Sequence, residues 1–98
     1  MLHEDKSALS KETLDMKRAI DSLREELEAV DWYRQRADAT EDANLKGILL
    51  HNMNEELEHA VMILEWIRQQ SPELDKQLRE YLFSNSTDIA AKEEKTEA

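Results

Sequence analysis

The sequence is poor in the residues that would support a disulfide-linked, β-rich or membrane-spanning protein. Its 98 residues include no cysteine, which excludes a disulfide framework and any thiolate metal site and fits a reducing cytoplasm. A single glycine, a single proline and few aromatic residues leave little material for turns and strands. No apolar run approaches the roughly 20 residues of a membrane span, and the start does not resemble a signal peptide. We therefore expect a helical cytoplasmic protein without a membrane partner.

Positive charge is also scarce. The chain carries 13 Lys and Arg against 23 Asp and Glu, which gives a formal net charge of −10. Because phosphate contacts need a basic face, this balance argues against nucleic acid as a partner. An acidic surface repels anions and gathers cations, although solubility alone would also account for the excess.

The spacing of apolar residues predicts two long helices. Ser10 is suited to cap the first, with Glu12 in its first turn, and the helix can run to about Arg36 or Ala37. Its seam repeats at steps of four and three through Met16, Ile20, Leu23, Leu27 and Val30. Thr40 in "DATED" is the expected cap of the second helix, and so short a connection makes the two helices antiparallel. The second seam keeps the same rhythm through Leu45, Leu49, Asn52, Glu56, His59, Ile63 and Trp66.

The rest of the chain divides into a short helix and two charged ends. Ser71 and Pro72 supply a cap and a first-turn proline for a third helix, amphipathic through Leu74, Leu78, Tyr81 and Leu82. We assign residues 10–83 to one helical domain, 1–9 to a flexible N terminus and 84–98 to a charged C-terminal tail, expected to be irregular. A two-helix hairpin cannot cover its own apolar stripes, so two chains should pair into an all-α four-helix bundle.

The second helix interrupts its apolar seam with polar groups. Asn52, Glu56 and His59 occupy successive seam positions in "HNMNEELEHA" (51–60). A buried carboxylate without a partner costs several kcal/mol. Glu26 flanks the seam of the first helix and, in a hairpin that turns near residue 39, falls at about the height of positions 52–56. One interpretation is that these groups only satisfy one another or fix the helix register.

The other interpretation is that they form half of a two-metal site. In ferritin-like di-iron bundles, two helices give one Glu each and the other two give Glu-x-x-His. Two copies of this chain would supply Glu26, Glu56 and His59 twice, and the four carboxylates would balance two divalent cations. Mostly oxygen donors with one imidazole favour iron or manganese over zinc or copper. Tyr33, about 20° from Glu26 around the axis, could hydrogen-bond a ligand, although a half-buried core tyrosine has the same spacing.

Two motifs, "EELEAVDWY" (25–33) and "HNMNEELEHA" (51–60), make the chain resemble the encapsulated ferritin family. The resemblance runs from about Leu9 through "EYLF" (80–83). Members of that family are ferroxidases held as cargo inside encapsulin nanocompartments of bacteria and archaea. The resemblance implies that Glu26, Glu56 and His59 of two chains form a di-iron centre, with Tyr33 beside them. It also implies a decameric ring of dimers that oxidises Fe(II) with dioxygen and relies on the encapsulin shell to store the mineral.

The resemblance further implies that Glu25 and Glu28 form a site where metal enters, near Trp32, which other divalent cations could also occupy. These three residues share one helix face, nearly opposite the Leu23 stripe. Two exposed glutamates are otherwise an ordinary solvated face, whereas an exposed tryptophan is less ordinary.

Some features lie outside the family pattern. His3 and His51 match no ligand position, and we interpret them as a residue of the N-terminal tail and a residue on the helix flank. Encapsulin cargo usually ends in a Gly- and Leu-containing docking peptide, whereas this chain stops at "KEEKTEA" (92–98) with no glycine after Gly47. Either a docking segment was removed or this member docks differently, so the shell partner is implied by the resemblance alone.

Two other functions remain open from the sequence. A non-catalytic helical adaptor, whose polar seam only sets register, predicts no stoichiometric iron and no oxygen consumption. A carrier or enzyme for another divalent metal, such as manganese or zinc, would keep the ligands and change the cation.

Overall fold

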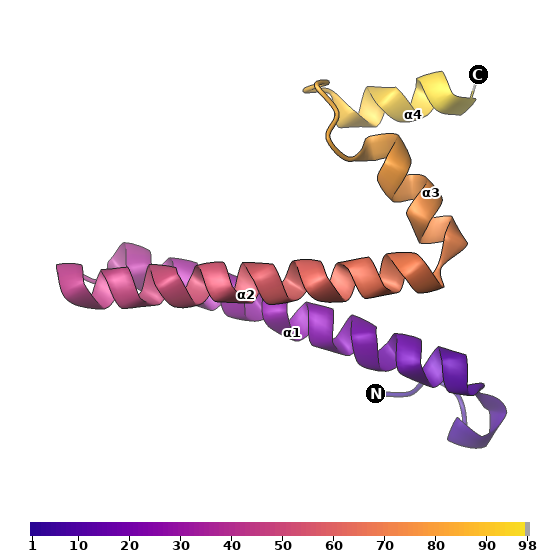
Figure 1. Cartoon of the computed structure of the whole chain (residues 1–98), viewed down its shortest axis with the longest axis horizontal. Helices are drawn as coiled ribbons and strands as arrows, with labels where there is room; N and C mark the ends of the chain where they lie inside the picture. Colours follow the sequence, from indigo (N-terminus) through magenta and orange to yellow (C-terminus); the bar gives the residue numbers. More distant parts are fainter. Residues whose placement is uncertain (98) are drawn as a thin grey trace. The chain divides into compact units, whose positions relative to one another are not determined.

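The computed structural model describes residues 1–97, with side chains through residue 93, and every regular element in that range is helical (Figure 1). A short 3-10 helix, η1 (Lys6–Ala8), precedes α1 (Lys11–Ala39), α2 (Ala43–Gln70), α3 (Pro72–Tyr81) and α4 (Ile89–Glu97). The predicted all-α fold class is confirmed. None of the helices in the described range is long and apolar enough to cross a membrane. The chain forms two units, residues 1–67 and 68–98, which are described separately.

The first long helix begins where its capping residue predicts. The Ser10 side chain accepts a hydrogen bond from the Thr13 backbone N–H at 3.1 Å, and Glu12 lies in the first turn, near the positive end of the helix dipole. α1 continues slightly beyond the expected end, to Ala39. There the Thr40 N–H donates to the Arg36 carbonyl at 3.1 Å and closes the last turn.

The connection to α2 corrects one prediction. Thr40 does not cap α2, because its hydroxyl oxygen accepts the Asp42 N–H within the turn, at 3.2 Å. Asp42 is the cap instead: its Oδ1 accepts the Leu45 N–H at 2.8 Å, and its carbonyl accepts the Lys46 N–H at 2.9 Å. An ionised carboxylate forms a stronger bond to a backbone N–H than a neutral hydroxyl does. The cap of α2 is therefore Asp42, two residues later than predicted, and the helix begins at Ala43.

The helices α1 and α2 form the predicted antiparallel hairpin and diverge toward the N terminus of α1 (Figure 1). This hairpin has almost no closed core. Of the described residues, only the apolar side chains of Ala37, Ala60 and Ile67 are buried. On the outside of α2, Val61 and Met62 are 63% and 64% exposed. The hairpin thus leaves apolar stripes uncovered, as its sequence predicts, while the pairing of two chains into a bundle stays a prediction.

The third helix is fixed by its cap and by a small charged network. Ser71 accepts the Leu74 N–H at 3.1 Å, with Pro72 as the first helical residue, as predicted. Asp75 Oδ1 accepts hydrogen bonds from Arg68 at 2.6 Å and from Arg79 at 3.0 Å. The bond from Arg68, and then that from Arg79, lowers the pKa of Asp75 below its ordinary value.

The two ends of the chain differ from the expectation of irregular structure. The irregular tail is wrong for Ile89–Glu97, which forms α4. Asp88 Oδ1 accepts the Ala91 N–H at 3.1 Å and caps this helix, whose Ala, Glu and Lys residues favour helix formation. Residues 84–88 contain no helix, and position 98 lies outside the described residues. At the other end η1 occupies part of residues 1–9, and the flexibility of that segment stays a prediction.

Candidate metal centre

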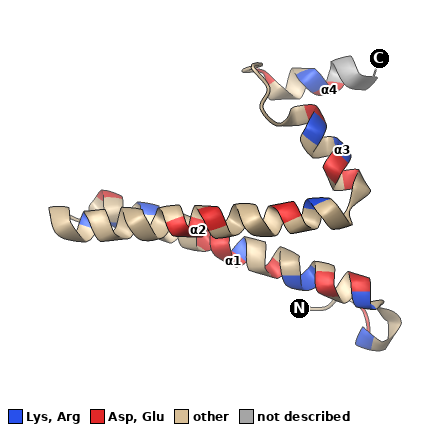
Figure 2. Cartoon of the chain, in the orientation of Figure 1, with Lys and Arg blue, Asp and Glu red and all other residues tan. Residues whose placement is uncertain are grey.

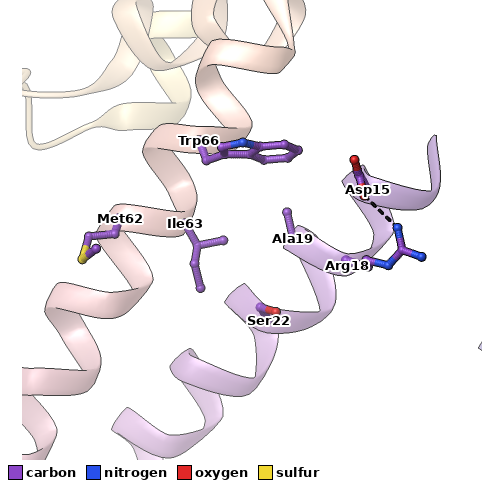
Figure 3. Close-up of a pocket in the computed structure, with 7 residues that line it drawn as sticks. All are labelled: Asp15, Arg18, Ala19, Ser22, Met62, Ile63 and Trp66. Carbon is purple, nitrogen blue, oxygen red and sulfur yellow. Dashed lines mark hydrogen bonds and ion pairs between the residues drawn. The ribbon is translucent and has the colours of Figure 1, made fainter. Parts of the chain in front are cut away.

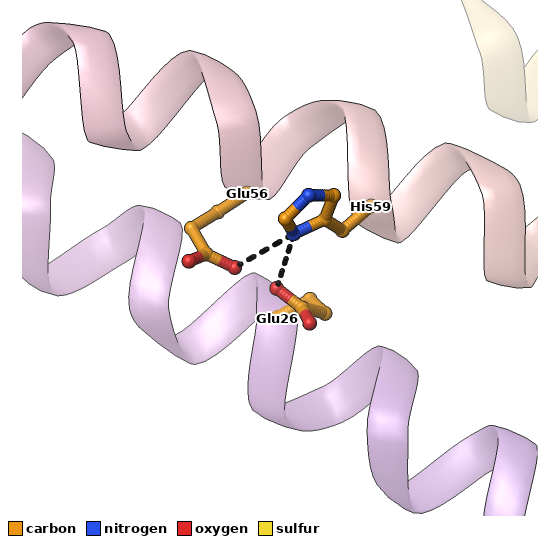
Figure 4. A group of neighbouring side chains, drawn as sticks. All are labelled: Glu26, Glu56 and His59. Atoms are coloured by element: carbon orange, nitrogen blue, oxygen red, sulfur yellow. Dashed lines mark ion pairs between the residues drawn. The ribbon is translucent and has the colours of Figure 1, made fainter.

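Three side chains converge where α1 and α2 lie side by side (Figure 4). Glu26 comes from α1, and Glu56 and His59 come from α2, where a spacing of three residues places them on one side of the helix. One ligand atom from each residue lies within 4.8 Å of the others. The antiparallel register thus brings Glu26 to the Glu56–His59 turn, at the height expected from the sequence. We call these three residues the Glu–His cluster.

The distances within the Glu–His cluster suit a cation better than direct hydrogen bonds. His59 Nδ1 lies 3.6 Å from Glu56 Oε2 and 3.8 Å from Glu26 Oε2. Hydrogen bonds of this type are shorter, at about 2.7–3.2 Å. Two ligands that each bind one ion at about 2.1 Å can lie up to about 4.2 Å apart. The two distances from His59 are therefore compatible with atoms arranged around an ion.

One atom of the cluster lacks a hydrogen-bond partner. Glu26 Oε2 is buried and accepts no hydrogen bond from the described part of the chain. A buried acceptor without a hydrogen bond costs about 1–3 kcal/mol, and more when it is charged. A divalent cation held between two carboxylates and an imidazole would supply the missing partner. The donor set and this unsatisfied oxygen therefore fit a metal ion.

The charge around the cluster also favours cations. Within residues 25–33 of α1 and residues 47–67 of α2, every charged residue apart from histidine is acidic, and Lys and Arg flank these two stretches (Figure 2). These acidic residues are Glu25, Glu26, Glu28 and Asp31 on α1, and Glu55, Glu56, Glu58 and Glu65 on α2. Their summed potential attracts cations toward the middle of the hairpin and is screened by salt.

One side of the cluster is open and borders apolar surface. The side chains of Glu26 and Glu56 are 26% and 25% exposed, and that of His59 is 47% exposed. Along the same face of α2, Ile63 and Trp66 line a groove of about 500 Å³ and point across it toward Ala19 of α1 (Figure 3). His59 thus lies partly exposed on the same face of α2 as this apolar groove, which the described residues leave open.

The other predicted site residues lie outside the cluster. Tyr33 is half-buried, and its hydroxyl makes no hydrogen bond with the described residues. Glu25 and Glu28 are exposed, and Trp32 is 48% exposed. Asn52 is half-buried on α2 without joining the three ligands. The structure therefore gathers only the predicted ligands, and the roles of the remaining residues stay predictions.

The remaining histidines are distant from the cluster. His51 Nε2 lies 3.7 Å from Glu55 Oε1, one turn further along α2, and both side chains are largely exposed. His3 lies in the exposed N-terminal segment before η1. Neither histidine joins a group of ligand atoms in the described residues.

Sequence reasoning did not identify Arg36. The central guanidinium carbon of Arg36 lies 6.0 Å from the centre of the Trp32 ring and 5.8 Å from the centre of the Tyr33 ring. These distances are at the outer limit of cation–π contact. The signal was present in the sequence, because residues three and four apart face each other on a helix.

Comparison with known proteins identifies relatives of this chain. The family model described as EncFtn-like matches residues 1–85. A Thermotoga maritima protein named Ferritin-like protein is 47% identical over 92 residues, which cover 94% of this chain and 81% of the relative. The crystal structure of protein ne0167 from Nitrosomonas europaea superposes with a TM-score of 0.83 and 59% identity, over 87% of this chain and 93% of that one.

Two further relatives carry names that refer to encapsulation. The Encapsulated ferritin-like protein of Rhodospirillum rubrum is 52% identical over 82 residues, or 84% of this chain. The Encapsulin nanocompartment cargo protein EncC of Myxococcus xanthus is 40% identical over 52 residues, or 53% of this chain. The matched regions span 59% and 40% of these two relatives, so both extend well beyond the region they share with this chain.

Proposed function

Because the chain belongs to the EncFtn-like family, we propose that it is a ferroxidase, which oxidises Fe(II) to Fe(III) with dioxygen at a di-iron centre between two chains. The observation that carries the proposal is the buried, unpartnered Oε2 of Glu26, next to Glu56 and His59. Two carboxylates and one imidazole are half of the donor set of a ferritin-like di-iron bundle. A second copy supplies the other half.

Two features of the hairpin support a centre shared by two chains. The His59 side chain is 47% exposed although it belongs to the cluster. On the same face of α2, Leu45, Ile48 and Trp66 are 45%, 53% and 39% exposed. Burial of apolar surface is worth about 25 cal/mol per Å², so covering this face with a second copy stabilises the pair. The same step encloses the Glu–His cluster.

The residues of the cluster have distinct tasks in this reaction. Glu26 and Glu56 give oxygen donors, and His59 gives a nitrogen donor, so two chains offer four carboxylate charges to two Fe(II) ions. Each Fe(II) would give up one electron, so that the two electrons from a pair of irons, together with two protons, reduce one dioxygen to hydrogen peroxide. Carboxylates keep their charge as the iron becomes more positive, which favours the oxidised product. Tyr33 is proposed to orient a ligand, and Glu25 and Glu28 are proposed to gather iron or another divalent cation near Trp32.

The names of two relatives extend the proposal to a compartment. We propose that the chain is cargo of an encapsulin shell in a bacterium or archaeon, as a ring of dimers, and that Fe(III) leaves toward a mineral stored inside the shell. The Rhodospirillum rubrum and Myxococcus xanthus proteins are named as encapsulated or encapsulin cargo proteins. In this account the hairpin oxidises iron and the shell stores it.

Oxygen uptake on addition of Fe(II) tests the proposed function. With the parent protein, dioxygen is expected to be consumed faster than by the same Fe(II) concentration in buffer without protein. His59→Ala is expected to lower this rate at least about 10-fold, because the loss of a ligand costs more than the loss of a residue that orients one. His51→Ala is the matched control, since it removes an exposed histidine of the same helix that lies outside the cluster. An oxygen electrode measures the rate of oxygen uptake, and iron analysis measures the iron bound to the protein. Uptake at the buffer rate by the parent protein, with no bound iron, would favour the helical adaptor instead.

A further inference from the structure

Arg36 lies between two aromatic rings of α1 that have different surroundings. Trp32 is 48% exposed and shares an outer face of α1 with Glu25 and Glu28. Tyr33 is half-buried, two turns beyond Glu26 on nearly the same side of the helix, or about 10 Å along its axis. The guanidinium carbon of Arg36 is about equally far from both rings, at 6.0 Å and 5.8 Å. One side chain therefore links the outer acidic face to the side of the helix that carries the Glu–His cluster.

The guanidinium of Arg36 has no other partner among the described residues. It forms no ion pair and no side-chain hydrogen bond there, in a chain with a net charge of −10 that offers many carboxylates. Its backbone is held in the last turn of α1, where its carbonyl accepts the Thr40 N–H at 3.1 Å. A cation at this end of a helix is also favoured by the helix dipole. The two rings are thus the contacts that the Arg36 guanidinium makes among the described residues.

We propose that Arg36 is a positioning residue, which holds Trp32 and Tyr33 in fixed orientations along the route from the outer acidic face to the Glu–His cluster. This inference rests on the proposed function only for the iron route. A planar guanidinium can stack on two rings at once, whereas the ammonium of lysine is a compact point charge. When these two ring contacts are lost, the exposed indole of Trp32 becomes mobile first, because less of the chain restrains it. A mobile Trp32 then obstructs cations that move from Glu25 and Glu28 toward Glu26.

The experiment compares Arg36→Gln and Arg36→Lys with Arg34→Gln. For fluorescence these variants are made in a Trp66→Phe background, so that Trp32 is the single tryptophan, and for Fe(II) oxidation they are made in the chain that keeps Trp66. Arg34→Gln is the control, because it removes the same charge from an exposed arginine of α1 that makes no ring contact. Acrylamide quenching of the metal-free protein measures the mobility of Trp32. Steady-state Fe(II) oxidation measures KM and kcat separately.

Both Arg36 variants are expected to raise the quenching constant of Trp32 about twofold to fivefold, the range that a cation–π contact at an exposed site supports. They should raise the KM for Fe(II) by a similar factor and leave kcat within about twofold. Arg34→Gln should change neither the quenching constant nor the KM. Unchanged quenching in both variants would overturn the positioning role. The positioning role would also be overturned if Arg36→Lys kept the KM of the parent and Arg36→Gln lowered it. That result would mean that the charge of residue 36, and not its contact with the rings, determines the KM for Fe(II). Quenching needs no iron, so it decides the role of Arg36 even if the protein does not oxidise iron.

Discussion

Replacing Glu26 with glutamine is expected to lower Fe(II)-dependent oxygen uptake by at least about 100-fold, since it removes a metal ligand and its charge while keeping the shape of the side chain. Glu26 is the single ligand that α1 contributes to the Glu–His cluster. Without it, each chain offers the cluster one carboxylate instead of two. Two divalent cations are then no longer balanced by the charges of the pair.

The same variant should make the metal-free protein more stable. Glu26 Oε2 is buried without a hydrogen bond, next to the carboxylate of Glu56. A glutamine amide can donate to Glu56, and it removes one of two neighbouring negative charges. The free energy of unfolding should rise by about 1 kcal/mol, the typical net value of one hydrogen bond. Activity and stability then change in opposite directions, which general damage to the fold cannot produce.

Asp31→Asn is the matched control for both measurements. Asp31 lies on α1, is exposed, and accepts a hydrogen bond from Gln35 at 3.0 Å, which an asparagine oxygen can still accept. The substitution removes one negative charge from the same helix without touching the cluster. It should change oxygen uptake and thermal unfolding little. Parent-like uptake by Glu26→Gln would remove Glu26 from the centre.

Removal of metal is expected to dissociate the paired chains. In the metal-free pair, the four carboxylates of two Glu–His clusters would lie close together with no cation between them, which opposes association. A cation that binds only the paired state stabilises it by about 2.7 kcal/mol at a concentration 100 times its Kd, and this lowers the dissociation constant of the pair about 100-fold. Anaerobic Fe(II) should therefore promote assembly and chelator should reverse it.

Sedimentation velocity over a range of protein concentrations measures this linkage. Fe(II) without oxygen prevents oxidation and mineral formation from confusing the result. Glu56→Ala should remain unresponsive to Fe(II), because it lacks one ligand of the cluster, whereas Asp31→Asn should respond as the parent does. Identical mass distributions in chelator and in Fe(II) would show that assembly and metal binding are independent.

Much of the fold was predictable because it depends on local signals. Ser10 and Ser71 cap helices as their sequence context predicts, since a serine hydroxyl followed by a helical run can accept an unpaired N–H. The α2 cap was misplaced because Thr40 and Asp42 can both cap, and only the turn geometry decides between them. The helix α4 was not predicted, because its high charge density indicates an irregular tail. The Asp88 cap and the strong helix formers after it favour a helix instead.

The meeting of the candidate ligands was also predictable, because it depends on register. A short connection forces α1 and α2 to be antiparallel, and the turn then fixes which heights on the two helices meet. Glu26 reaches Glu56 and His59 for this reason. The contacts of Arg36 were not predicted, because they join exposed neighbours on one helix and leave no mark in the pattern of buried apolar or acidic positions. Register within the hairpin does not determine which face a partner covers, so the contribution of a second chain is predicted from the half-complete ligand set alone.

A crystal structure of the iron-loaded protein, with anomalous data at the iron edge, tests the central claim most directly. The account predicts two irons about 3.5–4 Å apart between two chains, as in other two-metal sites, with ligands from Glu26, Glu56 and His59 of both chains. A lone iron held within one chain, or a cluster that faces away from every contact between subunits, would contradict it.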